Sequence, residues 1–391
     1  MTRHRILFVD DDPQMQELYQ MLGAYLGEDY DAYVAPGGAH ALKLLEEMPM
    51  DIIVSDLAMP EMSGREFLTR VVAKFPESIR IVISGHADQL TVAQCLMFGH
   101  RYFQKPFLLE NFTATLKRIC RLKYLVGSDK IKRVVCGLGA LPTPPDTYLR
   151  LSETLNSPDS SIDDITRIVL EDPGLTVKVL QIVNSAEFGI ARRINTPSEA
   201  VQIIGYEILR ALMLSVQAFK FYDNKPPKSL SVTQLWNHSL RTAVAAKRLA
   251  RFEKLSPDDS EAAFVSGLLH DIGKLVLAVN ADSEYEILIK RSHTESLPIE
   301  VLEQMVFGAS HAHIGAYLLG LWGLPDLVVD TVEAHHSLGM QKSKGFSVAT
   351  AVHLAQCLEP AGKRITNVDH QYLEQIGVPE NIGVWQQVLD S

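Results

Sequence analysis

The stretch Ile6-Leu-Phe-Val-Asp-Asp-Asp-Pro13 joins four apolar residues to three consecutive aspartates and a proline. The apolar run has the length of a short buried strand. The Asp-Pro pair that follows is typical of a helix start, with Asp12 as the N-cap and Pro13 at the first helical position. A strand that leads directly into a helix is the repeating unit of an α/β fold, so the stretch predicts an α/β domain here.

Two further apolar runs of strand length follow, Asp51-Ile-Ile-Val-Ser55 and Ile79-Arg-Ile-Val-Ile-Ser84. The segments between the runs show the spacing of amphipathic helices, as in Met15–Leu22 and Ala39–Leu45. Near-continuous apolar strands that alternate with helices are typical of a parallel sheet covered on both faces. We therefore expect such a sheet in this part of the chain.

Polar side chains follow these strands at the points where the strands end. Asp10 and Asp11 come after the first run, Asp56 comes after the second, and Ser84 closes the third. Open α/β sheets bind their ligands at this carboxyl edge. Three carboxylates in one crevice repel each other unless a hard cation neutralises them. The sequence therefore predicts a Mg²⁺ site formed by Asp10, Asp11 and Asp56.

With these residues in place, the first third of the chain resembles the receiver domain of bacterial two-component response regulators, over about residues 3–122. The resemblance rests on Val9-Asp-Asp11, Ser55-Asp-Leu-Ala-Met-Pro-Glu-Met-Ser-Gly64, Ser84 and Tyr102-Phe-Gln-Lys-Pro-Phe107. It implies a flavodoxin-like fold with a five-stranded parallel sheet. It also implies a sensor histidine kinase as the partner that supplies the phosphoryl group.

The resemblance assigns a role to each residue of the pocket. Asp56 is the phosphoacceptor, and Mg²⁺ is bound by Asp10, Asp11, Asp56 and the backbone carbonyl of Ala58. Lys105 contacts the phosphoryl oxygens, and the Lys105-Pro106 peptide bond is expected to be cis, as receivers usually have it. Ser84 and Tyr102 form the switch: the added charge draws the Ser84 hydroxyl inward, and the aromatic ring of Tyr102 fills the space that Ser84 leaves. Phosphoryl transfer needs mainly positioning and neutralised charge, which a metal ion and an ammonium group supply.

After the receiver the pattern becomes helical. Leu108–Arg133 has the pattern of an amphipathic helix that breaks near Gly127-Ser128, and Leu141-Pro-Thr-Pro-Pro145 cannot continue a helix. Long helices are predicted for Val232–Phe252 and Asp258–Val279. The predicted organisation is a receiver over residues 1–122, a helical linker over 123–137, an all-α output domain over 138–358 and a C-terminal helical extension over 359–391.

Histidines gather in the all-α part of the chain. The stretch Gly267-Leu-Leu-His-Asp-Ile-Gly-Lys-Leu-Val-Leu277 places a His-Asp pair and a lysine among apolar residues. Further histidines follow or precede it at His238, His311, His313, His335, His336 and His353. A single histidine on an apolar helix is usually a core or capping residue. Several imidazoles with one carboxylate on successive helices are more typical of a site for zinc, iron or manganese.

Residues from about Leu138 to Leu358 resemble the HDOD family, a helical output module related to HD-type metal-dependent phosphohydrolases. The resemblance rests on an ordered series of motifs. These are Leu141-Pro-Thr-Pro144, Glu171-Asp-Pro-Gly-Leu175, Val183-Asn-Ser-Ala186, His238-Ser-Leu-Arg-Thr-Ala243, Leu269-His-Asp-Ile-Gly-Lys274, His311-Ala-His-Ile-Gly315, Leu321-Trp-Gly-Leu-Pro325 and His335-His336.

Set beside the HD-GYP cyclic-dinucleotide phosphodiesterases, the chain keeps most of the polar positions of an HD site. Lys274 matches a phosphate-contacting lysine. The matches to metal-ligand positions are His238, His270, Asp271, His311, His335 and His336.

Three departures from that pattern bear on activity. Ser337-Leu-Gly-Met340 replaces the glycine-tyrosine-proline signature, Gln356 stands in place of the terminal metal-binding aspartate, and Gln234 stands where some relatives carry a glutamate. With Asp271 as the only anionic ligand, two dications would keep an excess of about three positive charges. The sequence therefore predicts a single zinc, manganese or iron ion held by His238, His270 and Asp271. The ligand positions left over, His311, His335 and His336, would then contact an anion.

Composition and charge exclude several classes of protein. Apolar residues make up 47% of the 391 residues and charged residues 21%, the balance of a globular protein with substantial cores. A formal charge of −10 argues against sequence-independent nucleic-acid binding. No signal peptide and no uninterrupted apolar segment of membrane-spanning length is expected, which predicts a cytoplasmic protein. The cysteines lack CxxC spacing and are predicted to be reduced: Cys95, Cys120, Cys136 and Cys357.

Together these features predict a response regulator that is phosphorylated on Asp56 and signals through a non-catalytic HDOD module. This module would bind a downstream protein or a cyclic nucleotide, and the chain could form a homodimer, as receivers often do. The alternative is a metal-dependent phosphohydrolase or cyclic-dinucleotide phosphodiesterase of HD type, regulated by the receiver, with Lys274 stabilising the developing charge. A DNA-binding transcription factor is disfavoured, because the chain is acidic and lacks a basic recognition helix.

Overall fold

A computed structural model describes residues 3–85, 101–126, 227–321, 324–340, 345–358, 368–377 and 381–390, with further residues between 150 and 209. The chain forms two compact units, divided between Pro144 and Pro145. Most of the predicted linker, over 123–137, lies outside the described residues. The exact limits predicted for the four segments of the chain therefore stay predictions.

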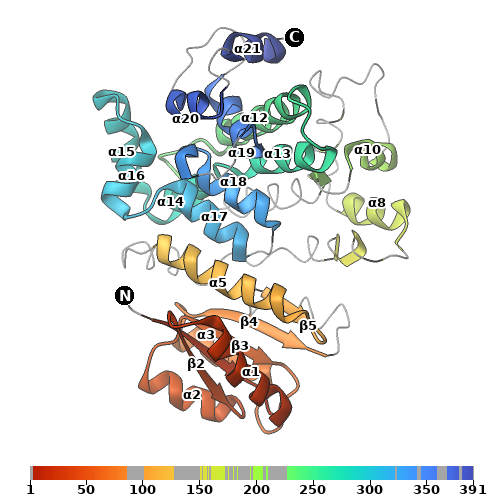
Figure 1. The fold of residues 1–391 in the computed structure, drawn as a ribbon, viewed down its shortest axis with the longest axis vertical. Helices are drawn as coiled ribbons and strands as arrows, with labels where there is room; N and C mark the ends of the chain where they lie inside the picture. Colours follow the sequence, from red (N-terminus) through yellow and green to blue (C-terminus); the bar gives the residue numbers. More distant parts are fainter. Residues whose placement is uncertain are drawn as a thin grey trace. The chain divides into compact units, whose positions relative to one another are not determined.

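The first unit is built on one parallel sheet of five strands, in the order β2-β1-β3-β4-β5 (Figure 1). The three apolar runs found in the sequence form β1, β3 and β4, and the sheet and fold class are confirmed. The edge strands β2 and β5 have weaker signals, because β2 is only half-buried and β5 has four residues. The strands are β1 (His4–Val9), β2 (Tyr30–Ala35), β3 (Ile52–Asp56), β4 (Ile79–Ser84) and β5 (Arg101–Gln104).

Helices cover this sheet, with α1 packed beside α5 and α2 beside α3. The Asp12 side chain accepts a hydrogen bond from the Gln14 backbone N–H at 2.9 Å, and Pro13 opens α1, as predicted. The peptide bond Lys105-Pro106 is cis, which confirms that expectation. The helices are α1 (Pro13–Leu26), α2 (Gly38–Glu47), α3 (Gly64–Lys74) and α5 (Leu109–Leu125).

All regular elements among the described residues of the second unit are helices, which confirms the all-α prediction. Its helices in the first half are α8 (Ile162–Glu171), α10 (Pro197–Ile204), α12 (Val232–Phe252), α13 (Pro257–Leu269), α14 (Ile272–Asn280) and α15 (Asp282–Glu295). The second half contains α16 (Ile299–Phe307), α17 (His311–Leu321), α18 (Asp326–Ala334), the 3₁₀ turn η2 (Leu338–Met340), α19 (Val348–Cys357), α20 (His370–Gln375) and α21 (Ile382–Asp390).

One helix prediction matches the structure and one is wrong. Val232–Phe252 is α12, as predicted. Asp258–Val279, predicted as one helix, is two helices, because the chain leaves helical geometry at Asp271, with φ −98° and ψ 8°. The break places His270 and Asp271 at the junction of α13 and α14, where their side chains face a common pocket rather than one stripe of a straight helix.

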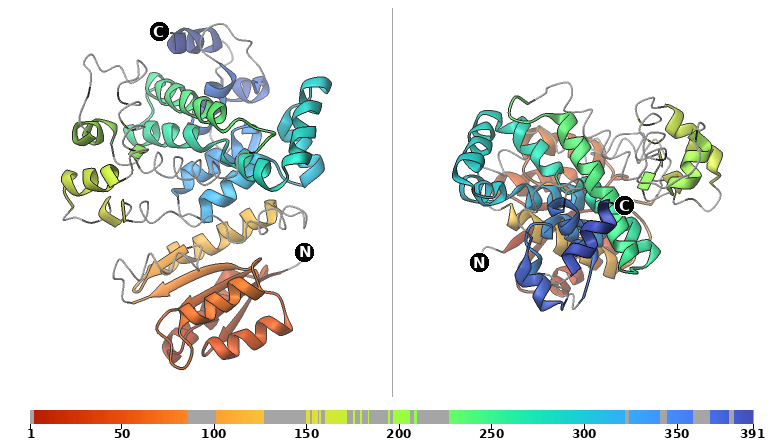
Figure 2. Two further views of the ribbon diagram at one scale, coloured as in Figure 1. Left: turned by 180° about the vertical axis from the view of Figure 1, so that it is seen from behind. Right: turned by 90° about the horizontal axis from the view of Figure 1, so that it is seen from above.

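The core of the helical unit joins α12 to α13, α19 and the C-terminal helices. Figure 2 shows the blue C-terminal helices beside the green α12. Trp385 of α21 is fully buried in this core, and its indole N–H donates to Glu253 Oε1 at 2.6 Å. The residues predicted as a C-terminal extension thus complete the hydrophobic core.

The segment Pro257–Asn280 is long and apolar enough to cross a membrane by length and composition, although Asp271 and Lys274 interrupt its apolar run. In the structure 83% of its most apolar window is buried. Its apolar side chains are therefore accounted for by the core of the helical unit.

Candidate phosphoacceptor pocket and metal centre

The first candidate site lies at the carboxyl edge of the sheet. Asp10 follows β1, Asp56 ends β3 and Lys105 follows β5. The Lys105 ammonium lies 2.8 Å from Asp10 Oδ2 and 2.5 Å from Asp56 Oδ2. Both aspartates are buried, while Asp11 beside them is half-buried. The structure therefore brings the predicted acidic residues and Lys105 together in one pocket.

The two oxygens of Asp56 have different partners. Oδ1 accepts hydrogen bonds from the backbone N–H groups of Leu57 at 2.6 Å and Ala58 at 3.2 Å. Oδ2 points to Lys105 instead. The backbone thus fixes the orientation of the carboxylate and leaves Oδ2 at the lysine. This arrangement suits a nucleophilic carboxylate, because a phosphoryl group transferred to Oδ2 would lie beside the Lys105 ammonium.

Burial and pairing shift the pKa values of this pocket. Burial raises the pKa of Asp10, although the hydrogen bond from Lys105 opposes it. Burial alone would lower the pKa of Lys105, but its bonds to Asp10 and Asp56 raise it overall. The ammonium is therefore charged at neutral pH and available to an anionic group in the pocket.

The predicted switch residues are only partly described. Ser84 is buried at the end of β4, and its carbonyl accepts a hydrogen bond from the Lys105 N–H at 2.8 Å. Tyr102 lies in β5 opposite Val82, but its side chain is outside the described residues. The switch roles of both residues stay predictions.

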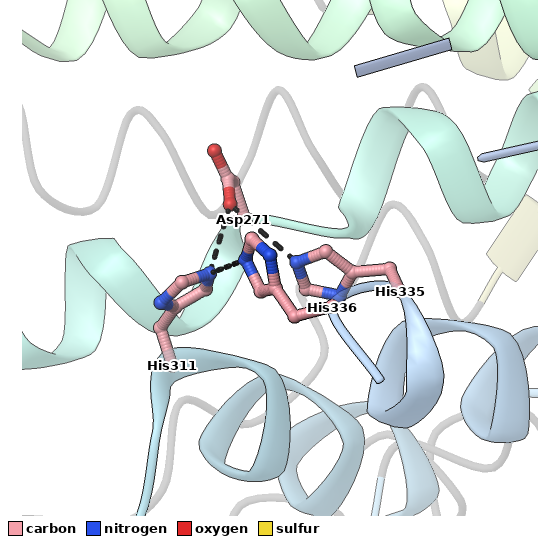
Figure 3. A group of neighbouring side chains, drawn as sticks. All are labelled: Asp271, His311, His335 and His336. Atoms are coloured by element: carbon pink, nitrogen blue, oxygen red, sulfur yellow. Dashed lines mark hydrogen bonds and ion pairs between the residues drawn. The ribbon is translucent and has the colours of Figure 1, made fainter. Parts of the chain in front are cut away.

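The second candidate site is a cluster of histidines around Asp271 in the helical unit. Figure 3 shows Asp271, His311, His335 and His336 converging from the α13–α14 junction, the start of α17 and the segment after α18. Asp271 Oδ1 lies 3.2 Å from His311 Nε2 and 3.9 Å from His335 Nε2. His336 Nε2 lies 2.9 Å from His311 Nε2. Four predicted ligands thus meet at one point.

The other oxygen of Asp271 faces a different set of residues. Oδ2 lies 3.3 Å from His270 Nε2, 3.8 Å from His238 Nε2 and 2.7 Å from the Lys274 ammonium. The structure therefore brings together all six predicted ligand positions and Lys274. Two groups within this set could hold a metal ion: Asp271, His311, His335 and His336, and His238, His270 and Asp271.

Hydrogen bonds determine which ring nitrogen of three histidines faces the pocket. His270 Nδ1 lies 2.7 Å from the Gly267 carbonyl, and His335 Nδ1 lies 2.6 Å from the Val332 carbonyl. A carbonyl only accepts, so Nδ1 carries the proton in both rings and Nε2 keeps its lone pair. His311 is held in the same way by Glu303 Oε2, at 2.6 Å from Nδ1. In all three rings Nε2 is the nitrogen that faces Asp271.

Several atoms that face this pocket are buried without a hydrogen-bond partner in the described structure. They are His270 Nε2, His335 Nε2 and Asp271 Oδ1. A buried polar atom without a partner is costly, and a metal ion in either candidate group would satisfy the unpartnered atoms of that group. The donor set therefore fits a borderline metal such as zinc, manganese or iron.

Burial and charged neighbours shift the pKa values of the histidines around Asp271 in different directions. Burial lowers the pKa of His238 to about 4 and the pKa of His335 and His336 well below the usual value. Burial alone would raise the pKa of Asp271, but His270 and Lys274 hold it well below its usual value. Burial opposes protonation of His311, but the Glu303 carboxylate raises its pKa to about 9.

Sequence reasoning missed Glu303, which is fully buried on α16. Its Oε2 accepts from the His311 backbone N–H at 2.7 Å as well as from the ring, and its Oε1 accepts from Tyr285 Oη at 2.8 Å. The sequence does contain one signal for Glu303: it is an acidic residue on the apolar face of a helix, beside Leu302 and Phe307, where a charged side chain is unusual.

Gln356, predicted to replace a metal-binding aspartate, holds the histidine doublet through the backbone. Its Nε2 donates to the His335 carbonyl at 2.8 Å, and His353 Nδ1 lies 2.7 Å from the same oxygen. An aspartate lacks this donor, so the glutamine has a structural use of its own. Gln234 is exposed on α12.

Comparisons with known proteins agree with the two-unit architecture. Family models match the response regulator receiver domain over residues 6–117 and the HDOD domain over residues 141–338. An uncharacterized protein of Treponema pallidum is 33% identical over 204 residues, which cover 51% of this chain and 38% of that protein. The sensor histidine kinase TmoS of Ectopseudomonas mendocina is 31% identical over 132 residues, which cover 33% of this chain and 13% of the kinase.

A crystal structure of an HDOD domain protein of unknown function from Geobacter sulfurreducens is also similar. It has 25% sequence identity and a TM-score of 0.50, over 70% of this chain and 89% of that one. The matched residues cover 38% of the length of the Treponema protein and 13% of the length of the kinase.

Proposed function

Because the chain belongs to the HDOD family and carries a receiver domain, and is thus a response regulator with an HDOD module, we propose that Asp56 is its phosphoacceptor. The phosphoryl group would come from a sensor histidine kinase. The observation that carries this proposal is the contact of Lys105 with both Asp10 and Asp56 at the carboxyl edge of the sheet.

The geometry supports a direct transfer. Asp56 Oδ2 attacks the phosphorus of a phosphohistidine, the P–O bond forms as the P–N bond breaks, and the histidine nitrogen takes up a proton. The N–H groups of Leu57 and Ala58 hold the other oxygen of Asp56 in place. Lys105 then pairs with the phosphoryl oxygens. Mg²⁺ held by Asp10, Asp11, Asp56 and the Ala58 carbonyl would supply further neutralising charge.

The output of this response regulator is proposed to be binding rather than catalysis. The helical unit lacks a glycine-tyrosine-proline signature after His336, and Lys274 already neutralises one oxygen of Asp271. A downstream protein or a cyclic nucleotide is the proposed partner. We propose that the protein is located in the cytoplasm. We also propose that it forms a homodimer in which two receiver domains pair.

The phosphoacceptor is tested by incubating the protein with a small phosphodonor and measuring its intact mass. We expect one added phosphoryl group that requires Mg²⁺ and is lost in Asp56→Ala. Asp12→Ala is the matched control, because Asp12 is an exposed aspartate at the same edge whose side chain only caps α1. Label that persists in Asp56→Ala would remove the assignment.

A second candidate function is metal-dependent phosphohydrolysis in the histidine cluster. The unpartnered atoms of His270, His335 and Asp271 favour it, because they leave room for a metal ion. When bound, such an ion supplies an activated hydroxide and draws charge from a phosphoryl oxygen. Lys274 would stabilise the charge that develops on the phosphate, and Asp271 would hold the nucleophile's position.

We expect little or no hydrolysis of a cyclic dinucleotide by the wild-type protein with added Mn²⁺ or Fe²⁺. The measurement is product formation compared with His270→Ala and Asp271→Ala. Turnover that depends on the metal and disappears in both variants would make the enzyme the primary function.

A further inference from the structure

The two oxygens of Asp271 are not equivalent, and the difference suggests how many metal ions the cluster takes. This inference rests on the metal site proposed above. Oδ2 already has a cation, the Lys274 ammonium at 2.7 Å. Oδ1 has no hydrogen-bond partner among the described residues, and His311 and His335 present ring nitrogens to it. A further cation on the Oδ1 side would therefore not lie directly beside the ammonium that already occupies Oδ2.

Lys274 occupies the oxygen of Asp271 that a second metal ion would need as a ligand. An ion held by His238 and His270 would bind Oδ2 and would be a close neighbour of the ammonium. Two positive charges at such a distance in a largely buried pocket repel each other strongly. The lysine thus acts against a second ion on that side.

Glu303 provides the pocket with a second buried carboxyl group. Its two oxygens accept from three donors, the His311 ring, the His311 backbone N–H and Tyr285 Oη. These three hydrogen bonds fix the orientation of the Glu303 side chain. A carboxylate on Nδ1 also orients a ligand histidine and makes its Nε2 a stronger donor to a metal. His270 and His335 have only backbone carbonyls in this position.

The charges favour one dication over two. Set against the carboxylates of Asp271 and Glu303, one dication together with Lys274 leaves an excess of about one positive charge, whereas two dications together with Lys274 leave an excess of about three. We propose that the cluster takes one divalent cation on the Oδ1 side of Asp271, with Glu303 as a positioning residue acting through His311. The ligands on this side are Asp271, His311, His335 and His336. This is the opposite side of Asp271 from the one expected from the sequence.

The stoichiometry is tested by titrating the chelator-stripped full-length protein with Zn²⁺ in excess Mg²⁺. The Mg²⁺ occupies the oxygen ligands of the receiver, so Zn²⁺ reports the histidines. We expect one equivalent of Zn²⁺ for the wild type and a second, weaker equivalent for Lys274→Met. Two equivalents in the wild type would overturn the proposal, and so would a single unchanged equivalent in Lys274→Met.

The role of Glu303 is tested in the same titration with Glu303→Gln. We expect Zn²⁺ affinity to fall about 10- to 100-fold, the usual effect of removing such a partner of a ligand histidine. The absorption bands of Co²⁺ in the same site should also shift, which a purely structural change away from the ligands would not cause. Glu261→Gln is the matched control, because Glu261 pairs with Lys247 and touches no ligand.

The outcomes separate the two levels of the proposal. A wild type that binds no Zn²⁺ would overturn the metal site itself. One equivalent bound equally by Glu303→Gln and Glu261→Gln, with unchanged Co²⁺ bands, would overturn only the role of Glu303. If Glu303→Gln does not fold by circular dichroism, Tyr285→Phe removes one donor from the same carboxylate. A fall in Zn²⁺ affinity in this variant supports the role, and wild-type affinity overturns it.

Discussion

Two glycines determine how closely the segments of each site approach one another. A Cβ atom added at Gly64 would lie 1.9 Å from the backbone oxygen of Asp56. At Gly273 it would lie 2.0 Å from the His311 carbonyl oxygen and 2.9 Å from the Gly315 N atom. Because backbone atoms cannot move aside as a flexible side chain can, only glycine fits at either position. Gly273 thus sets the distance between Asp271 and His311.

Gly273→Ala should separate the start of α14 from the start of α17. We expect the helical unit to lose about 1–3 kcal/mol of unfolding free energy, the typical cost of overpacking a core. Zn²⁺ binding should weaken as well, because Asp271 and His311 no longer meet. Urea denaturation and Zn²⁺ titration measure the two effects.

Gly339→Ala is the control for this substitution, because no described atom other than those of its chain neighbours lies within 4 Å of a Cβ at that position. Its stability and Zn²⁺ affinity should stay near the wild-type values. Wild-type Zn²⁺ affinity in Gly273→Ala would mean that the close approach of the two helices is not needed by the site.

Among the elements, α19, α20 and α21 lie beyond the family pattern, which ends at residue 338, and α20 and α21 are the last two of them. Tyr372 and Leu373 of α20 and Trp385 and Leu389 of α21 are buried in the same cluster as α12 and α19. The indole of Trp385 bonds Glu253, the residue that ends α12. These helices therefore help to hold α12, the helix that carries His238.

Trp385→Ala should lower the unfolding free energy of the helical unit by about 3–5 kcal/mol, the usual cost of removing a buried aromatic side chain. Hydrogen exchange of the α12 amides is the measurement, because the two units need not unfold together. Val384→Ala, at a residue that is 43% exposed on the same helix, should have little effect. Equal protection of α12 in both variants would show that α21 does not stabilise it.

At the scale of the molecule, the sequence predicted what depends on local pattern. The apolar runs became β1, β3 and β4, and the spacing of polar residues after them placed Asp10 and Asp56 in one pocket. The break at Asp271 was missed, because the polar residues His270, Asp271 and Lys274 were interpreted as a candidate metal site and not as the end of a helix.

The remaining features depend on contacts between segments that are far apart in the chain. Glu303 forms its hydrogen bonds with His311 and Tyr285 only because the fold brings α16, the start of α17 and α15 together. Gln356 has a use only because α19 brings it to the His335 carbonyl. The sequence of a helix shows that a polar residue among apolar ones is unusual, but it does not show which distant residue will form a hydrogen bond with it.

The polar residues of the α13–α14 junction also bear on the fate of the nascent chain. The segment Pro257–Asn280 has a mean hydropathy of 1.6 in its most apolar window, and by length and composition it could span a bilayer. An aspartate or lysine at the centre of such a segment raises its insertion free energy by up to about 3.5 kcal/mol, whereas each leucine or isoleucine lowers it by only about 0.5 kcal/mol. Asp271 lies near the middle of the segment and Lys274 one turn further. The residues that form the pocket therefore also disfavour insertion of this segment into a bilayer before its own core has formed around it.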